Sequence, residues 1–185
     1  YGRVSQMTLS ELVTLDAGSW FDTRFAGARI PTLAQVFEAV GQRLLINVEI
    51  KVEAGYHPVQ QEMEAVHLIQ EHHMAHRVIV SSFSPSSLRR VHKLDPNIAL
   101  GFLYAGRVPV YLLRCLSWLG VPYHALHPAF GSVDAAYVAK ARQVGQQVNV
   151  WTVNVADDMR RMRDLGVDSI ITNYPDLLGQ ILAER

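Results

Sequence analysis

Short runs of aliphatic and aromatic residues alternate along this chain with longer stretches in which apolar residues recur three or four positions apart. The short runs predict β-strands, and the longer amphipathic stretches predict helices. The expected strands span residues 44–52, 78–83, 98–104, 124–130, 148–153 and 169–172. The expected helices span residues 60–73, 85–94, 109–119, 133–144, 157–165 and 176–183, and the first has Met63, Val66 and Ile69 or Gln70 on its apolar stripe.

This alternation predicts a parallel sheet covered by helices, because parallel neighbours require crossover connections. Successive strands begin roughly 20 to 34 residues apart, close to the ~31 residues per unit of an eight-unit barrel. The alternative is a doubly wound sheet, which typically carries a glycine-rich phosphate loop after its first strand. Neither G-x-G-x-x-G nor G-x-x-x-x-G-K occurs in the chain, so we favour a (β/α) barrel.

The residues before position 44 follow a different pattern. Thr8 and Glu11 have the spacing of a capping box at the start of a short helix. An irregular stretch follows at residues 16–21, and a second helix is expected to begin near residues 30–33 and to run through Val40. This part of the chain predicts a long connection that leads into the helix before the first strand.

The first expected strand carries an acid and a base on one face. Side chains alternate along a strand, so Asn47, Glu49 and Lys51 point the same way, and Glu49 and Lys51 lie roughly 6.6 Å apart. The aliphatic residues between them point toward the helices. A buried Glu–Lys ion pair or an edge strand with a hydrated polar face would also give this pattern, since ionisable groups are seldom buried unless paired. The functional interpretation is a catalytic or binding site.

The charge balance limits the class of partner. The formal net charge of the 185 residues is zero and the pI is near 7.3, so no overall field attracts nucleic acid or an anionic membrane. We expect a small-molecule substrate, and a homo-oligomer is left open. The alternating acidic and basic residues of helix 157–165 predict a solvated helix face.

Targeting signals and cysteine content indicate the compartment. The most apolar stretch, residues 108–121, contains Pro109 and Arg114 and is too short for a membrane span. The first residues do not resemble a signal peptide. Cys115 is the only cysteine, which excludes an intrachain disulfide, and it is expected to be a buried thiol. These features predict a cytoplasmic protein.

Six segments that together cover nearly the whole chain carry a family resemblance. They read M-T-L-S-E-L-V-T-L-D-A-G-S-W-F, I-P-T-L-A-Q-V-F, L-L-I-N-V-E-I-K, V-I-V-S-S-F, V-N-V-W-T-V-N and G-V-D-S-I-I-T-N-Y-P-D. In this order and spacing they resemble glycerophosphodiester phosphodiesterases of the short bacterial type. The resemblance implies a (β/α)8 TIM barrel that forms one domain over residues 1–185. Residues 1–29 would be the tail of an insertion after strand 2, and residues 30–185 would run from helix 2 through helix 8.

The resemblance also implies that part of the barrel is missing. The family carries an H-R pair on its first strand, an E-x-D pair on its second and an H-D pair in the insertion, and all three positions would lie before Tyr1. Strands 3 to 8 would therefore be present and the first two βα units absent. We expect the chain to be incomplete as a catalyst.

Roles for individual residues follow from the resemblance and from the barrel. By resemblance, Glu49 is a metal carboxylate and Lys51 the phosphate-side lysine, with Mg²⁺ or Ca²⁺ as the cofactor, and both residues are catalytic. Barrel enzymes place their sites at the carboxyl ends of strands, which adds Phe83, His127 and Trp151 as substrate-binding candidates. Core packing is the alternative for both aromatic residues, and a structural hydrogen bond is the alternative for His127.

The expected activity is metal-dependent hydrolysis of glycerophosphodiesters to glycerol 3-phosphate and an alcohol. Two alternatives remain: a catalytically inactive barrel that acts as a binding or interaction module, and a related phospholipase-type phosphodiesterase on the same fold.

Overall fold

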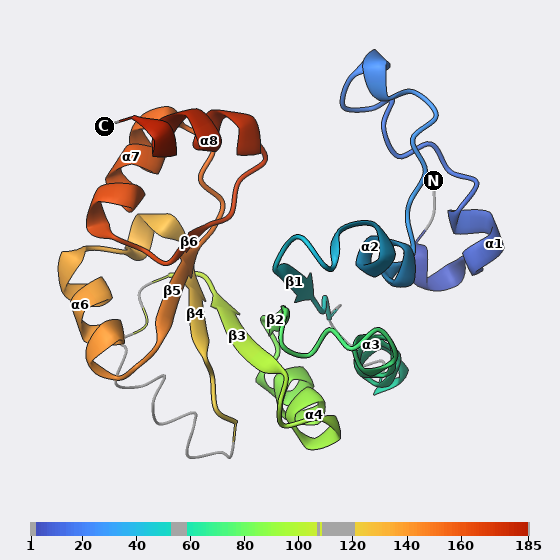
Figure 1. Cartoon of the computed structure of the whole chain (residues 1–185), viewed down its shortest axis with the longest axis horizontal. Helices are drawn as coiled ribbons and strands as arrows, with labels where there is room; N and C mark the ends of the chain where they lie inside the picture. The colour runs from blue at the N-terminus through green and yellow to red at the C-terminus, as the bar shows by residue number, and fades with distance from the viewer. Residues whose placement is uncertain (1–2, 53–58, 107, 109–120, 185) are drawn as a thin grey trace. The chain divides into compact units, whose positions relative to one another are not determined.

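The computed structural model describes residues 3–52, 59–106, 108 and 121–184, and it divides into two compact units, Tyr1–Leu44 and Leu45–Arg185. The larger unit is an α/β fold built on one parallel sheet, which is curled like part of a barrel (Figure 1). The sheet comprises β1 (Ile46–Glu49), β2 (Val78–Ser82), β3 (Ala99–Tyr104), β4 (Ala125–Pro128), β5 (Gln147–Val150) and β6 (Ser169–Ile170).

The strand order in this sheet is the order along the chain. Every neighbouring pair is parallel, from β1 with β2 to β5 with β6. A doubly wound sheet reverses its strand order at a switch point, so this alternative is excluded for the strands described. β1 and β6 form the two edges of the six-stranded sheet.

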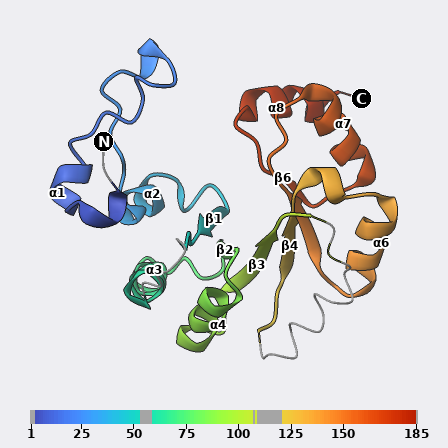
Figure 2. The ribbon, with the colours of Figure 1, turned by 180° about the vertical axis from the view of Figure 1, so that it is seen from behind.

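Helices connect the strands at the positions expected from the sequence. They are α3 (Val59–Glu71), α4 (Pro85–Leu94), α6 (Ala135–Gln143), α7 (Ala156–Leu165) and α8 (Pro175–Ala183), with a short 3-10 helix at Phe130–Ser132. α4 packs against β2 and β3, and α6 packs against β5 (Figure 2). The helix expected at residues 109–119, with Cys115, lies outside the described residues.

The core lies between the sheet and its helices. Strand register aligns Val48 with Val80 and Val80 with Leu100 on one face, and Val80, Leu100 and Leu126 are completely buried. The opposite, concave face carries most of the polar strand residues, as the alternation of side chains predicts.

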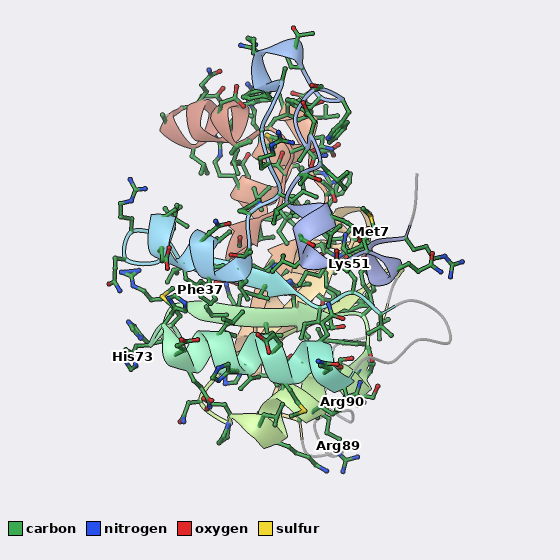
Figure 3. The ribbon with its side chains drawn as sticks, turned by 90° about the vertical axis from the view of Figure 1, so that its right-hand side faces the viewer. Met7, Phe37, Lys51, His73, Arg89 and Arg90 are labelled. Carbon is green, nitrogen blue, oxygen red and sulfur yellow. The ribbon has the colours of Figure 1, made fainter. Side chains whose placement is uncertain are left out.

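The buried stripe of α3 differs from the expected one. Met63 is 53% exposed, whereas Glu62 is fully buried together with Val66 and Ile69. Glu62 accepts a 2.7 Å hydrogen bond from Arg90 of α4, which lies beside α3 (Figure 3). The prediction of Met63 on the apolar stripe was wrong because this ion pair turns a charged residue inward.

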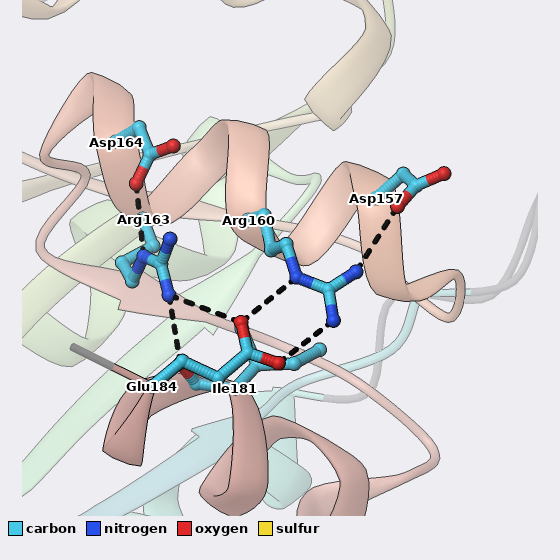
Figure 4. Close-up of polar contacts among 6 residues, drawn as sticks. All are labelled: Asp157, Arg160, Arg163, Asp164, Ile181 and Glu184. Atoms are coloured by element: carbon cyan, nitrogen blue, oxygen red, sulfur yellow. Dashed lines mark hydrogen bonds and ion pairs between the residues drawn. The ribbon is translucent and has the colours of Figure 1, made fainter.

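The charged face of α7 holds a neighbouring helix. Arg160 donates hydrogen bonds of 2.8 and 2.7 Å to the two carboxylate oxygens of Glu184, just beyond α8, and one of 3.0 Å to Asp157 (Figure 4). Arg163 donates a 2.8 Å bond to the carbonyl oxygen of Ile181 near the end of α8. The face expected to be only solvated therefore also fixes α8 on α7.

The smaller unit contains a 3-10 helix at Val4–Gln6, α1 (Leu9–Leu12), a 3-10 helix at Thr23–Phe25 and α2 (Leu33–Val40). The capping box of Thr8 and Glu11 is confirmed, and Thr32 and Gln35 form a second one at the start of α2. Between α1 and α2, Asp16 accepts hydrogen bonds from three backbone N–H groups, which hold the pKa of its carboxyl well below the usual range.

Candidate active site

The polar residues of β1 lie exposed on one face of the sheet edge. Asn47 and Glu49 share one face of the strand, and Lys51 follows Glu49 by two residues; all three are exposed. Within the part of the chain that the structure describes, Glu49 and Lys51 make no hydrogen bond or ion pair. The buried Glu–Lys pair is therefore excluded, while a hydrated edge strand still fits the six strands present.

The residue between the acid and the base is firmly anchored. Ile50 is 2% exposed, and its backbone N–H donates a 2.8 Å hydrogen bond to the carbonyl oxygen of Ser81. Since alternate side chains point to opposite faces, burial of Ile50 directs Glu49 and Lys51 to the concave side. β1 spans Ile46–Glu49 and is shorter than the expected strand 44–52. The hydrogen bond of Ile50 extends its pairing with β2 by one residue.

Two predicted aromatic residues meet at the carboxyl ends of β2 and β5. Phe83 follows β2 directly and is 50% exposed, and its ring lies 5.4 Å from the Trp151 ring at an interplanar angle of 84°. The Trp151 indole N–H donates a 2.7 Å hydrogen bond to the carbonyl oxygen of His127. An aromatic pair that keeps half of one ring exposed can form the wall of a binding site.

The third predicted substrate-binding residue, His127, lies in the interior. Its side chain is 1% exposed and its Nε2 lies 3.0 Å from the Asn149 side-chain nitrogen. Burial lowers the pKa of His127 to about 4, so the imidazole is neutral near pH 7. These contacts are those of a structural histidine, and a contact with substrate stays a prediction.

The space for this imidazole depends on a glycine that sequence reasoning did not single out. A Cβ atom at Gly101 would lie 2.5 Å from His127 Nε2, so any side chain there would displace the ring. Glycine inside a strand often marks such a close approach, which is the signal that points to Gly101. Asn149, the polar neighbour of His127, could not be identified from the sequence in this way. Its position two residues before Trp151 indicates only that the two side chains share a face of the strand.

The concave face of the sheet also contains a cavity of about 420 Å³. Residues that line it include Asn47, Ile79, Ala99, His127, Asn149 and Ser169. Phe83, Trp151, Glu49 and Lys51 do not line it, and its walls lie toward the amino-terminal halves of the strands. The cavity is thus the inner surface of the curled sheet rather than the place where the candidate catalytic groups gather.

The metal prediction requires more ligands than the described residues provide. Among residues 3–52, 59–106, 108 and 121–184, no three His, Cys, Asp or Glu side chains gather as a metal site. Mg²⁺ and Ca²⁺ take six or more oxygen ligands, including bound water, and Glu49 offers a single carboxylate. The Glu49 carboxylate could serve as one ligand of such an ion. The ligands among the described residues are too few to hold it.

Comparison with known proteins decides the family. The model of the glycerophosphoryl diester phosphodiesterase family matches residues 1–177. The chain belongs to this family. Curated relatives are named glycerophosphodiester phosphodiesterase, an activity of the phosphoric diester hydrolase class, and the resemblance inferred from the six sequence segments is confirmed.

Curated relatives of this family match almost all of the chain. The glycerophosphodiester phosphodiesterase of Caldanaerobacter subterraneus subsp. tengcongensis is 38% identical over 179 residues, which cover 96% of this chain and 72% of the relative. The glycerophosphodiester phosphodiesterase of Bacillus subtilis is 30% identical over 193 residues, covering 97% of this chain and 66% of the relative. The chain thus spans about two thirds to three quarters of their length.

Solved structures of the family share the fold. An Oleispira antarctica phosphodiesterase in complex with the product sn-glycerol-3-phosphate superposes with a TM-score of 0.86 at 24% identity, covering 99% of this chain and 73% of that one. The glycerophosphodiester phosphodiesterase of Agrobacterium tumefaciens gives a TM-score of 0.76 at 22% identity, covering 97% of this chain and 74% of that one.

Of the helices described here, none is long and apolar enough to cross a membrane.

Proposed function

We propose that the protein containing this chain hydrolyses glycerophosphodiesters to glycerol 3-phosphate and an alcohol with the help of a divalent metal ion. The observation that carries the proposal is the exposed pair Glu49 and Lys51, directed to the concave side of a family-type sheet by the buried Ile50. The product bound to the Oleispira antarctica phosphodiesterase supports glycerol 3-phosphate as the product.

The same proposal includes a closed (β/α)8 barrel. The strands run in chain order from β1 to β6, and parallel edges seek partners, so two further βα units before residue 1 would close the ring. The share of the relatives' length that the chain covers supports this arrangement. In the closed barrel, residues 1–29 would be the tail of the insertion after strand 2.

Lys51 would act on the phosphate. A lysine ammonium is a compact charge with three donors, so it can bind non-bridging phosphate oxygens and stabilise the negative charge that grows in the transition state. Lys51 is exposed and free of ion-pair partners within the described chain, which leaves its charge available to substrate.

Glu49 would supply one oxygen ligand of Mg²⁺ or Ca²⁺, and carboxylates of the preceding units would supply others. When bound, the ion would neutralise phosphate charge as a Lewis acid. We assign the proton transfers to the histidines of the preceding units, because His127 is buried against Asn149.

Phe83 and Trp151 would form an apolar wall against the carbon atoms of the glycerol. Their edge-to-face packing and the exposure of Phe83 support this role. His127 would contribute to substrate binding through Trp151, whose indole N–H donates a hydrogen bond to the His127 carbonyl oxygen.

The full-length protein and glycerophosphocholine test this proposal, with glycerol 3-phosphate as the measured product. We expect release that EDTA abolishes and that Mg²⁺ or Ca²⁺ restores. Lys51→Ala should lower kcat by at least about 100-fold, the usual loss for a transition-state charge. Lys140→Ala removes an exposed lysine of α6 as a control and should leave kcat unchanged. Undiminished release in EDTA would contradict the metal dependence.

A catalytically inactive binding module is the second candidate, because the described residues provide a single carboxylate of the metal site. Binding of glycerol 3-phosphate by the full-length protein without turnover of any glycerophosphodiester would favour it. Hydrolysis of lysophosphatidylcholine to choline and lysophosphatidic acid, with no turnover of glycerophosphocholine, would instead favour the phospholipase-type alternative. A cytoplasmic location remains a prediction from the sequence.

A further inference from the structure

One buried hydroxyl group contacts the backbone between the proposed acid and base. Ser82, the last residue of β2, is 1% exposed, and its Oγ donates a 2.7 Å hydrogen bond to the carbonyl oxygen of Ile50. The backbone N–H of Ile50 is bonded to Ser81, as described above. Ile50 is therefore held at both its N–H and its carbonyl group by consecutive residues of β2.

The serine side chain lies on the face of the sheet away from the candidate site. The register pairs Val48 with Val80 and Glu49 with Ser81, so Ser82 shares the helix-covered face of Val80 and Ile50. A substrate on the concave side cannot touch its hydroxyl group. Any effect of Ser82 on the reaction must act through the backbone of residues 49–51.

The same hydroxyl group fixes the segment that contains Phe83. Its Oγ accepts a 3.1 Å hydrogen bond from the backbone N–H of Ser84, whose own Oγ accepts from Ser87 N–H at the start of α4. The Ser82 hydroxyl thus uses its donor and an acceptor site, and it joins the end of β1 to the first turn of α4. Phe83 lies between the two bonded residues.

We infer that Ser82 is a positioning residue for the reaction, which rests on the proposed function. By bonding the Ile50 carbonyl it sets the direction of Glu49 and Lys51, and by accepting from Ser84 it sets the turn that presents Phe83 beside Trp151. Removing such a supporting hydrogen bond commonly costs about 10- to 100-fold in activity or metal affinity.

The experiment compares Ser82→Ala and Ser82→Thr with the full-length wild-type protein. We expect Ser82→Ala to lower kcat about tenfold and to raise the Mg²⁺ concentration for half-maximal activity by a similar factor. Ser82→Thr, which keeps the hydroxyl group, should recover most of both. Hydrogen exchange at the amides of Ile50 and Lys51 should be faster in Ser82→Ala alone, and thermal unfolding confirms that each variant is folded at the assay temperature.

Ser87→Ala is the matched control, because Ser87 is also a fully buried serine but its hydroxyl group contacts Arg90 on α4 instead of β1. It should leave kcat, the Mg²⁺ requirement and exchange at Ile50 unchanged. Unchanged kcat and exchange in Ser82→Ala, or an equal loss of kcat in Ser87→Ala, would overturn the inference. An inactive wild-type protein would instead overturn the proposed function and the catalytic part of this inference. Hydrogen exchange at Ile50 and Lys51 would still show whether Ser82 holds residues 49–51 in place.

Discussion

At the scale of single residues, the position of a side chain on the sheet determines its chemistry. Glu49 and Lys51 lie exposed at the end of an edge strand, where both charges are free to meet a ligand. His127 lies two strands inside the sheet edge, where desolvation favours its neutral form. In the sequence all three are polar residues at strand ends. Only their burial in the structure distinguishes the exposed Glu49 and Lys51 from the buried His127.

The burial of His127 predicts a loss of stability in acid. The unfolded chain binds a proton at His127 near pH 6.5, whereas the folded protein binds it only near pH 4. Between these values the unfolded state holds more protons, so this residue lowers the free energy of unfolding by up to about 3 kcal/mol as the pH falls. Urea unfolding of wild type and His127→Gln from pH 7 to pH 4 measures the effect. Parallel curves for the two proteins would show that His127 titrates normally.

At the scale of helices and strands, local sequence signals predicted where an element begins and ends. Which face of a helix is buried depended on contacts with residues far away in the sequence. Residues 85–94 were expected as a helix, and α4 has those bounds because Ser84 caps it and Pro85 occupies its first turn. In α3, Val66 and Ile69 are buried as expected, but Met63 was mispredicted, since the partner that makes Glu62 an interior residue lies 28 positions away on α4. No periodicity within one helix reveals such a partner.

The Glu62–Arg90 pair predicts a large difference between two adjacent arginines. Arg90→Ala leaves the fully buried Glu62 carboxylate without its cation and should lower the free energy of unfolding by about 2 to 4 kcal/mol. Arg89 is exposed on the same helix (Figure 3), so Arg89→Ala serves as the control and should stay within about 0.5 kcal/mol of wild type. Equal denaturation midpoints for the two variants would mean that the buried pair contributes nothing.

At the scale of the whole molecule, more of the sheet than of the candidate site could be predicted from the sequence. Alternating strands and helices predict a parallel sheet, and the absence of a glycine-rich phosphate loop favoured the barrel, whose strands lie in chain order as observed. A metal and phosphate site needs groups from several strands, and the described chain contributes Glu49, Lys51 and the pair of Phe83 and Trp151. In the proposed closed barrel, the remaining groups of the site would belong to two preceding units, about which these residues carry no signal.

The closed-barrel proposal predicts that catalysis requires those units. A protein limited to residues 1–185 should release no glycerol 3-phosphate above the uncatalysed rate, under conditions in which the full-length protein turns over. Adding the two preceding βα units should restore activity and raise the free energy of unfolding, because both sheet edges would then be paired. Equal turnover by residues 1–185 alone would contradict the proposed barrel closure.

The most direct test of the account is the turnover of Glu49→Ala in the full-length protein. With glycerophosphocholine and saturating Mg²⁺ or Ca²⁺, we predict that kcat/KM for release of glycerol 3-phosphate falls by at least about 100-fold. Glu71→Ala removes an exposed carboxylate of α3 as the control and should match wild type. A Glu49→Ala protein that turns over at the wild-type rate would remove Glu49 from the mechanism and contradict the account.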